Sequence, residues 1–355
     1  ASYTITSLNA TSVTLVSSAD PSVLGASVTF TATVNDSVTP TGTVGFTENG
    51  TTIAGCGAVA LSGDTATCAL AFTSPGSFPI VATYSGDTSS LPSTSPALSQ
   101  LVGHTGLGYW IVATDGGVFN YGNAGFYGSA GGTHLNKPID GLASTPDGKG
   151  YWLVASDGGV FAYGDAKFYG SAGGTHLNAP IAGIAATPDG KGYWLVATDG
   201  GVFAYGDAKF YGSAGGTHLN KPVWGIAAAP DGKGYWLVAT DGGVFNYGDA
   251  GFFGSAGALR LNKPVVGIAA TPDGKGYWLV GNDGGIFTYG DAKFFGSAGS
   301  THLNAPVAGI ATTPDGKGYW LVATDGGVFN YGDARFFGSA GGTKLNQPAW
   351  AIAAS

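Results

Sequence analysis

The chain has 355 residues, and its composition excludes several classes of protein. Charged residues make up 10% of the chain and the formal net charge is −8, so we do not expect the clustered lysine and arginine of a nucleic-acid-binding face. No apolar run approaches the roughly 20 residues that a membrane-spanning helix needs. Aromatic residues make up 12%, which argues against a disordered chain. The length is enough for about two or three domains.

Residues 1–10 are expected to form an extra N-terminal strand, because apolar and polar side chains alternate there. This strand is either an edge strand of the domain that follows or the last strand of a preceding one. Alternatively, it pairs with a neighbouring molecule by β-strand addition, through Tyr3, Thr4, Ile5 and Thr6. Ala1 precedes a polar strand directly, so we expect it to be a mature N-terminus left after removal of a signal peptide.

Residues 11–102 are rich in threonine, serine and valine, and turn signals divide them about every ten residues. The strand candidates are SVTLVSS, SVTFTATVN, GTVGFTENG, TTIAGCGAVAL, ATCALAF and SFPIVATYSG. Short alternating strands at this spacing are typical of a β-sandwich.

The chain's two cysteines, Cys56 and Cys68, lie in the segment GCGAVALSGDTATCAL of the same region. LSGD is typical of a tight turn between two strands, which would place the cysteines opposite each other. We therefore expect a cross-strand disulfide and an oxidising, extracytoplasmic location. Two free thiols in a cytosolic strand pair are the alternative.

The segments SSADPSVLGASVTFTATV, PTGTVGF, ALSGDTATC and VATYSGD run through residues 11–102. In these segments the region closely resembles the bacterial Ig-like repeat domains of large secreted and surface proteins. The resemblance implies a spacer or assembly module without catalytic activity.

Residues 103–108 read as a short linker, and a repeat with a period of 42 residues occupies residues 109–355. A Tyr-Trp pair marks each unit, beginning at Tyr109, Tyr151, Tyr193, Tyr235, Tyr277 and Tyr319. Each unit has four strand candidates, which in one unit are APIAGIAATP, GYWLVATD, GVFAYG and KFYGSAG. Turns rich in aspartate and glycine connect them. Four short strands per unit at this period are typical of a propeller blade.

Two features favour a closed ring over an open array. First strands consist of small residues, as expected near an axis where blades converge, and later strands carry the large aromatics that fill the space between blades. The repeat region begins with a second strand and ends, at residues 348–355, with a first strand that can complete the first blade. We therefore expect an all-β protein in which an Ig-like β-sandwich precedes a six-bladed β-propeller closed by the C-terminal strand.

The repeated phrase GYWLVATDGGVFAYGDA resembles propeller-like repeats of secreted bacterial proteins, whose function is mostly unassigned. The Gly-His and Trp-Asp marks of WD40 repeats do not recur in the 42-residue units. The resemblance therefore gives no reason to expect intracellular scaffold partners.

Most aspartates recur at three turn positions of the repeat, which favours a role as turn formers. A catalytic carboxylate pair needs two different environments, whereas copies of one position share the same environment. Asp140 interrupts the pattern at a first-strand position and can face the channel, with no evident partner. Trp224 and Trp350 occupy the same position in two other units and are expected to fill the axis.

A ring of basic side chains in the THLN connectors is a candidate binding site at one channel mouth. Its members are His134, His176, His218, Arg260, His302 and Lys344, assisted by Lys137, Lys221 and Lys263. Such a ring can hold an acidic glycan or another anion by charge-assisted hydrogen bonds. Solvated loop residues are the ordinary alternative. A metal site is not expected, because cations occupy two of the six positions, and no cofactor is expected.

The sequence contains no serine elbow, metalloprotease motif or Cys-His pair that would indicate an enzyme. We therefore expect a secreted, non-catalytic protein of a bacterial surface that assembles with copies of itself into a filament or surface layer and displays the propeller. A lectin-like adhesin that binds surface glycans is the alternative, and an extracellular hydrolase is the least favoured interpretation. No nucleic-acid partner and no membrane span are expected.

Overall fold

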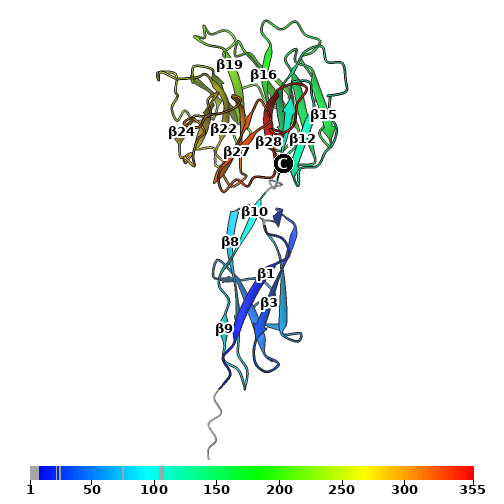
Figure 1. Ribbon diagram of the computed structural model, residues 1–355, viewed down its shortest axis with the longest axis vertical. Coiled ribbons are helices and arrows are strands. Elements are labelled where there is room, and N and C mark those ends of the chain that lie inside the picture. The colour runs from blue at the N-terminus through cyan, green and yellow to red at the C-terminus, as the bar shows by residue number, and fades with distance from the viewer. Residues whose placement is uncertain (1–7, 21, 24, 74–75, 104–107) are drawn as a thin grey trace, which may run out of the picture. The chain divides into compact units, whose positions relative to one another are not determined.

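A computed structural model of the chain describes residues 8–20, 22–23, 25–73, 76–103 and 108–355. All regular structure in these residues is β, which confirms the expected class. The chain divides into two compact units, residues 1–104 and 105–355 (Figure 1). Within the described ranges, no helix is long and apolar enough to cross a membrane.

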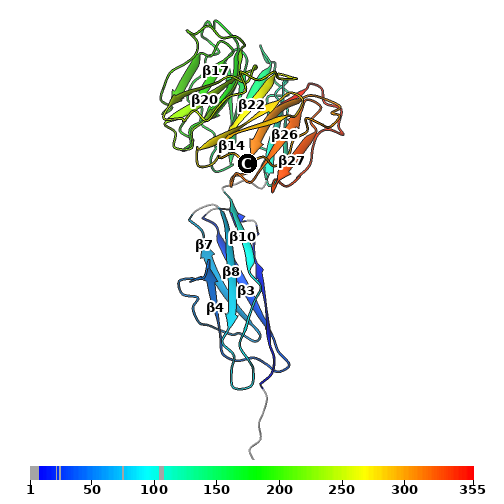
Figure 2. The same ribbon diagram turned by 90° about the vertical axis from the view of Figure 1, so that its left-hand side faces the viewer.

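The first unit contains two sheets, whose strands run side by side along its length (Figure 2). One sheet has the order β1-β3-β7, with β1 (Ser12–Ser17), β3 (Ser27–Asn35) and β7 (Thr65–Ala71). The other has the order β2-β10-β8-β4-β5, with β2 (Ser22–Val23), β10 (Leu98–Gly103), β8 (Gly76–Tyr84), β4 (Thr43–Glu48) and β5 (Thr51–Thr52). Two short strands, β6 (Val59–Ala60) and β9 (Ser93–Thr94), pair with β4 and β8. Only β2 and β10 pair in parallel among these strands.

The alternating pattern that predicts these strands also builds the core of the first unit. Every second side chain of β3 is buried, including Phe30 and Ala32. Phe46 of β4 and Ile80 of β8 join the same cluster from the other sheet. The two sheets therefore enclose one hydrophobic core.

Cys56 and Cys68 form the expected disulfide, with their Cα atoms 5.8 Å apart, but not across one hairpin. The N–H of Phe46 in β4 donates to the carbonyl of Cys56, whereas Cys68 belongs to β7 of the other sheet. The bond therefore joins the two sheets. The segment TTIAGCGAVAL is not one strand but β5, a turn and β6, because the chain turns at residues 53–56, where the Cys56 N–H donates to the Ile53 carbonyl.

The ends of the first unit differ in part from the expected boundaries. The proposed intermolecular strand residues, Tyr3, Thr4, Ile5 and Thr6, lie outside the described residues. The adjoining Asn9 forms a parallel bridge with Ser90, and its carbonyl accepts the N–H of Leu91. At the other end, Gly103 is the last residue of β10 and Gly108 the first of β11, so the described ends of the expected linker are strand residues.

The second unit contains six three-stranded antiparallel sheets of one design. Five are formed by consecutive strands. They are β13 (Ile139–Ser144), β14 (Gly150–Ala155) and β15 (Val160–Gly164); β16 (Ile181–Ala186), β17 (Gly192–Ala197) and β18 (Val202–Gly206); β19 (Val223–Ala228), β20 (Gly234–Ala239) and β21 (Val244–Gly248); β22 (Val265–Ala270), β23 (Gly276–Gly281) and β24 (Ile286–Gly290); and β25 (Val307–Thr312), β26 (Gly318–Ala323) and β27 (Val328–Gly332).

The remaining sheet combines strands from the two ends of the repeat region. It has the order β12-β11-β28, with β11 (Gly108–Ala113), β12 (Val118–Gly122) and the C-terminal strand β28 (Ala349–Ala354). In Figure 1 β28 is drawn in red, and β11 separates it from β12 in the sheet. Ile352 faces Ile111 in this register. The last strand of the chain therefore completes the sheet that the first strands of the repeat begin.

The fourth strand candidate of each unit is not a strand. The residues of KFYGSAG and its equivalents are irregular because their backbone groups bind aromatic side chains of two successive sheets instead of a β-ladder. The indole Nε1 of Trp152 donates to the Lys167 carbonyl. The hydroxyl of Tyr193, in the next sheet, donates to the Gly170 carbonyl and accepts the N–H of Tyr169. We call this set of contacts the aromatic clasp.

Hydrophobic clusters fill the spaces between successive sheets. In one of them, Trp110 and Val112 of β11 pack with Tyr151 and Leu153 of β14. The indole ring of Trp110 lies 5.3 Å from the ring of Tyr151, centroid to centroid. The repeat region is therefore held by several small cores of one kind, each shared by two neighbouring sheets.

Candidate functional site

The six first strands β13, β16, β19, β22, β25 and β28 share a cavity of about 100 Å³. In each of these strands a β-bulge leaves one residue out of the ladder. A bulge re-aims the side chain of its extra residue, and all six extra residues line the cavity: Asp140, Ala182, Trp224, Val266, Ala308 and Trp350. The position at which the repeat varies is thus the one that the ladder does not constrain.

Asp140 has a partner, contrary to the expectation from the sequence. Burial raises the pKa of Asp140 to about 6, and a hydrogen bond from the Ser156 hydroxyl partly opposes this effect. Trp224 and Trp350 meet edge to face in the cavity, with ring centroids 6.3 Å apart. The other side chains that line the cavity are apolar, so Asp140 has no second carboxyl group there with which to act.

The three repeated sets of aspartates take part in turns, as expected. The first set accepts the N–H two residues ahead, as Asp157 does from Gly159 at 3.0 Å. Its members are Asp115, Asp157, Asp199, Asp241, Asp283 and Asp325. The second set accepts a lysine N–H, and also a threonine hydroxyl except at Asp231, where Ala229 replaces the threonine. Asp273 accepts from Lys275 and Thr271 at 3.2 and 2.9 Å. The second set is Asp147, Asp189, Asp231, Asp273 and Asp315, and the third is Asp165, Asp207, Asp249, Asp291 and Asp333.

The second and third sets form pairs of neighbouring carboxyl groups, which comparison of the copies of one position does not reveal. In the pair of Asp315 and Asp333, burial and the charge of Asp315 raise the pKa of Asp333 to about 6. Burial also acts on Asp315, but hydrogen bonds from the Lys317 N–H and the Thr313 hydroxyl outweigh it and lower the pKa of Asp315. The pKa is raised in the same way at Asp165, Asp249 and Asp291, whose partners Asp147, Asp231 and Asp273 have lowered pKa values.

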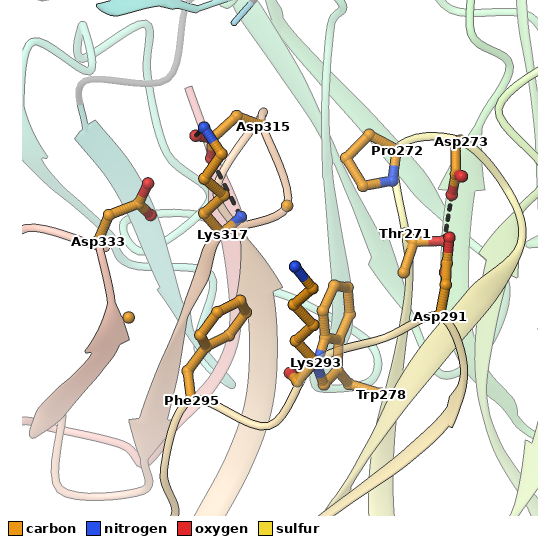
Figure 3. A pocket seen from close by; sticks show the side chains of 12 residues that line it. Thr271, Pro272, Asp273, Trp278, Asp291, Lys293, Phe295, Asp315, Lys317 and Asp333 are labelled. Carbon is orange, nitrogen blue, oxygen red and sulfur yellow. Dashed lines mark hydrogen bonds and ion pairs between the residues drawn. The ribbon is translucent and has the colours of Figure 1, made fainter. Parts of the chain in front are cut away.

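A pocket of about 570 Å³ lies between the sheet β22-β23-β24 and the sheet β25-β26-β27. Figure 3 shows Asp273 and Asp291 on one side of this pocket and Asp315 and Asp333 on the other. Between the two carboxyl pairs, the side chain of Lys293 extends into the pocket.

Aromatic rings form the floor of this pocket. Phe295 and Trp278 belong to the aromatic clasp, with ring centroids 6.5 Å apart. Trp278 is 1% exposed, so it presents only an edge. The ammonium of Lys317 lies 3.4 Å from Asp315 Oδ2, on the opposite side from Trp278. The pocket thus combines an apolar floor with both signs of charge.

Phe295 occupies a position at which the first three and the last three 42-residue repeats differ. In the first three clasps, a tyrosine hydroxyl at this position donates to a glycine carbonyl of the next sheet: Tyr127 to Gly148, Tyr169 to Gly190 and Tyr211 to Gly232, at 3.2, 3.0 and 3.1 Å. We call this bond the tyrosine latch. Phenylalanine replaces tyrosine in the last three clasps, at Phe253, Phe295 and Phe337. The change from KFYG to KFFG is visible in the sequence, but its consequence requires the structure.

The members of the proposed basic ring are all exposed loop residues: His134, His176, His218, Arg260, His302 and Lys344. A groove of about 580 Å³ beside one connector is lined by Lys221 and Lys263 but by no member of the ring. The ring therefore stays a prediction. In the part of the chain that the structure describes, no group of three histidine, cysteine, aspartate or glutamate side chains is arranged to hold a metal ion.

Comparisons with known proteins bear on the first unit. Residues 13–103 match a family model described as a bacterial Ig-like domain (group 3). None of the curated proteins matches the chain. A solved structure, a structural genomics protein of unknown function from Bacteroides thetaiotaomicron, is similar with a TM-score of 0.47 and 13% identity, over 99% of this chain and 94% of that one. Residues 13–103 are thus similar to bacterial Ig-like domains, and this match does not extend into the repeat region.

Proposed function

We propose that this chain is an extracellular, non-catalytic structural protein of a bacterial surface, with a repeat region that is a six-bladed β-propeller closed by the C-terminal strand. The observation that carries the proposal is the pairing of β28 with β11. The clasp supports it too: the Tyr109 hydroxyl donates to the Gly338 carbonyl at 2.6 Å, the contact that Tyr193 makes with Gly170 between successive sheets. A ring gives each sheet two neighbours and leaves none unpaired.

The arrangement of the carboxyl groups supports a non-catalytic role. A glycosidase needs two carboxyl groups on either side of the bond that is cleaved, separated by about 5 Å or more. Here the members of a pair lie side by side, and Asp315 accepts turn hydrogen bonds from the Thr313 hydroxyl and the Lys317 N–H. The same pair recurs in successive units, whereas a catalytic site is one individual constellation. The pairs therefore serve the turns.

The disulfide and the Ig-like match support the proposed location. Both are compatible with an extracellular protein, because disulfides persist mainly in oxidising compartments. An Ig-like unit in such a protein serves as a spacer for the unit that is displayed.

Self-association into a filament or surface layer is the finer part of the proposal. It rests on the alternating residues Tyr3, Thr4, Ile5 and Thr6, which can add a strand to a neighbouring sheet. Exposed phenylalanines offer further contacts, one in each unit and 56–60% exposed: Phe126, Phe168, Phe210, Phe252, Phe294 and Phe336. A head-to-tail contact of this kind polymerises unless its rotation closes a ring.

Electron microscopy of the purified protein, beside a variant that lacks residues 1–8, tests this function. Filaments or sheets of the full chain that disappear in the variant are expected. Single particles in both samples, at high protein concentration, would contradict self-association. Assemblies that persist without residues 1–8 would show that the protein associates through another surface.

A further inference from the structure

We propose that the pocket between the fifth and sixth sheets of the repeat, at Phe295, binds a neutral sugar unit of a polysaccharide. The inference concerns a single interface between two sheets. It adds a ligand to the structural protein proposed above and does not depend on self-association or on residues 1–8.

The tyrosine latch is missing at the Phe295 interface. At the equivalent interface, the Tyr169 hydroxyl donates to the Gly190 carbonyl at 3.0 Å. Gly316 is the equivalent glycine at the Phe295 interface, and it lines the pocket. Because Phe295 has no hydroxyl, the carbonyl of Gly316 lacks this donor. A ligand hydroxyl that enters the pocket can take the place of the tyrosine hydroxyl.

The carboxylate of Asp315 is more buried than its counterparts. Its side chain is 10% exposed, whereas the equivalent side chains of the other four units are 47–49% exposed. Asp315 Oδ2 is buried and has no hydrogen-bond partner, although the Lys317 ammonium lies 3.4 Å away. A buried polar atom without a hydrogen bond is costly, and a hydroxyl group of a ligand can supply the bond.

The charges of the pocket disfavour a charged ligand of either sign. Four carboxyl groups outnumber the two ammonium groups and repel anions, while the ammonium of Lys293 lies between the carboxyl pairs and opposes a second cation there. Among the described residues, Lys293 forms no ion pair, and Figure 3 shows its ammonium directed into the pocket. Carboxylates accept hydrogen bonds from sugar hydroxyls, and an ammonium donates to them. A polyhydroxylated ligand without charge satisfies both.

The volume and the floor of the pocket fit a sugar ring. About 570 Å³ is within the range of small-molecule sites, roughly 300–1,000 Å³. The ring of Phe295 offers apolar surface to the C–H groups of a sugar, while the sugar hydroxyls face the carboxyl pairs.

The neighbouring interface shows what distinguishes Phe295. At Phe253, where the latch is also missing, the pocket has about 370 Å³ and is lined by Trp236, Asp249 and Gly274. Gly251 occupies the position of Lys293 there. This smaller pocket therefore lacks the ammonium donor, and we expect the Phe295 pocket to bind more tightly.

Phe295→Tyr is the decisive variant, because tyrosine is the native residue at three equivalent positions. We expect Tyr at 295 to form the latch with Gly316 and to weaken binding at least about tenfold, the effect of one lost hydrogen bond to a charged or buried group. The matched control is Tyr169→Phe, which removes a latch elsewhere and leaves the Phe295 pocket intact. Lys293→Ala is expected to weaken binding less than Phe295→Tyr does.

Isothermal titration of the full chain and these variants supplies the test. The probes are short neutral glucan, mannan and galactan oligosaccharides, beside polygalacturonate as an anion and chitosan oligomers as a cation. Near-ultraviolet circular dichroism and Tm check that each variant is folded. Binding of a neutral probe that Phe295→Tyr weakens and Tyr169→Phe preserves is the expected result.

Each other outcome contradicts the inference. Absence of binding by all neutral probes, a preference for the anionic or cationic probe, and equal affinity of Phe295→Tyr and the unchanged protein would each overturn it. None of these results depends on whether filaments form, so the two proposals fail separately.

Discussion

The two units of this chain are stabilised in different ways. The first has one core that two sheets share, and one disulfide that joins them. The second has repeated small cores between successive sheets and a clasp at each of them. Substitutions in its single core are expected to destabilise the first unit most. The repeat region is expected to be most sensitive to changes in the sheet where its two ends meet, because no further repeat packs there.

Removal of residues 348–355 is expected to cause the largest loss of stability, and to confine it to the repeat region. It leaves β11 paired with β12 alone and removes the buried side chains of Ala349 and Ile352. We expect the free energy of unfolding of the repeat region to fall by roughly 5 kcal/mol or more, from lost burial and backbone hydrogen bonds. Differential scanning calorimetry should show a large fall in the Tm of this unit alone. Removal of Ser355 only is the control, and an equally small change in both variants would argue against the account.

Replacement of Cys56 and Cys68 by alanine acts on the other unit. The closed loop spans 12 residues of sequence separation, so we expect a loss of about 2–3 kcal/mol in the first unit. The same calorimetric trace carries its own control, because the transition of the repeat region should not move. A shift of both transitions would show that the units do not unfold independently.

Tyr151→Phe weakens one clasp among several. The Tyr151 hydroxyl donates to the Gly128 carbonyl and accepts the N–H of Tyr127, so its loss is expected to cost about 1–2 kcal/mol. Tyr163→Phe is the matched control, because the ring of Tyr163 lies 5.7 Å from that of Tyr151 but its hydroxyl takes no part in the clasp. Chemical denaturation measures both, and equal losses would contradict the role of the clasp.

Asp140→Asn should produce the smallest change, and one that depends on pH. The pKa of Asp140 is raised from 3.8 to about 6 in the folded protein, so the folded state binds its proton more tightly than the unfolded state. Stability from this group therefore falls as pH rises from about 4 to about 6. The variant should gain about 1 kcal/mol at pH 7, after allowance for solvent screening, and nothing at pH 4 or below. Tm measured against pH checks this sign, and a gain that is greatest at low pH would reverse it.

Much of the fold follows from the sequence, because alternating side chains indicate strands and a regular repeat indicates copies of one structural unit. The alternation in SVTFTATVN gives β3 at the expected residues, and the repeat of 42 residues gives six equal sheets. The fourth strand failed because KFYGSAG has strand-like residues whose backbone groups bind Trp and Tyr side chains of two sheets. Propensity does not reveal that competition.

The site was less predictable than the fold. Position-by-position comparison of the repeats hid the carboxyl pairs, since Asp315 and Asp333 belong to different turns of one unit. The disulfide pairing was correct, but its place between sheets depended on a turn at Gly55, whose φ of +78° interrupts the expected strand. Phe295 differs from the equivalent Tyr169 by one oxygen atom. The effect of this difference becomes visible only in the structure, where the Tyr169 hydroxyl donates to the Gly190 carbonyl.

Hydrogen exchange of the unmodified protein, followed by mass spectrometry, tests the proposed closure most directly. The amides of β28 (Ala349–Ala354) and of β13 (Ile139–Ser144) occupy equivalent places in their sheets. If the ring is closed, β28 should be protected about as strongly as β13, although it ends the chain. Rapid exchange of β28, as in a frayed terminus, while β13 stays protected would contradict the closed propeller.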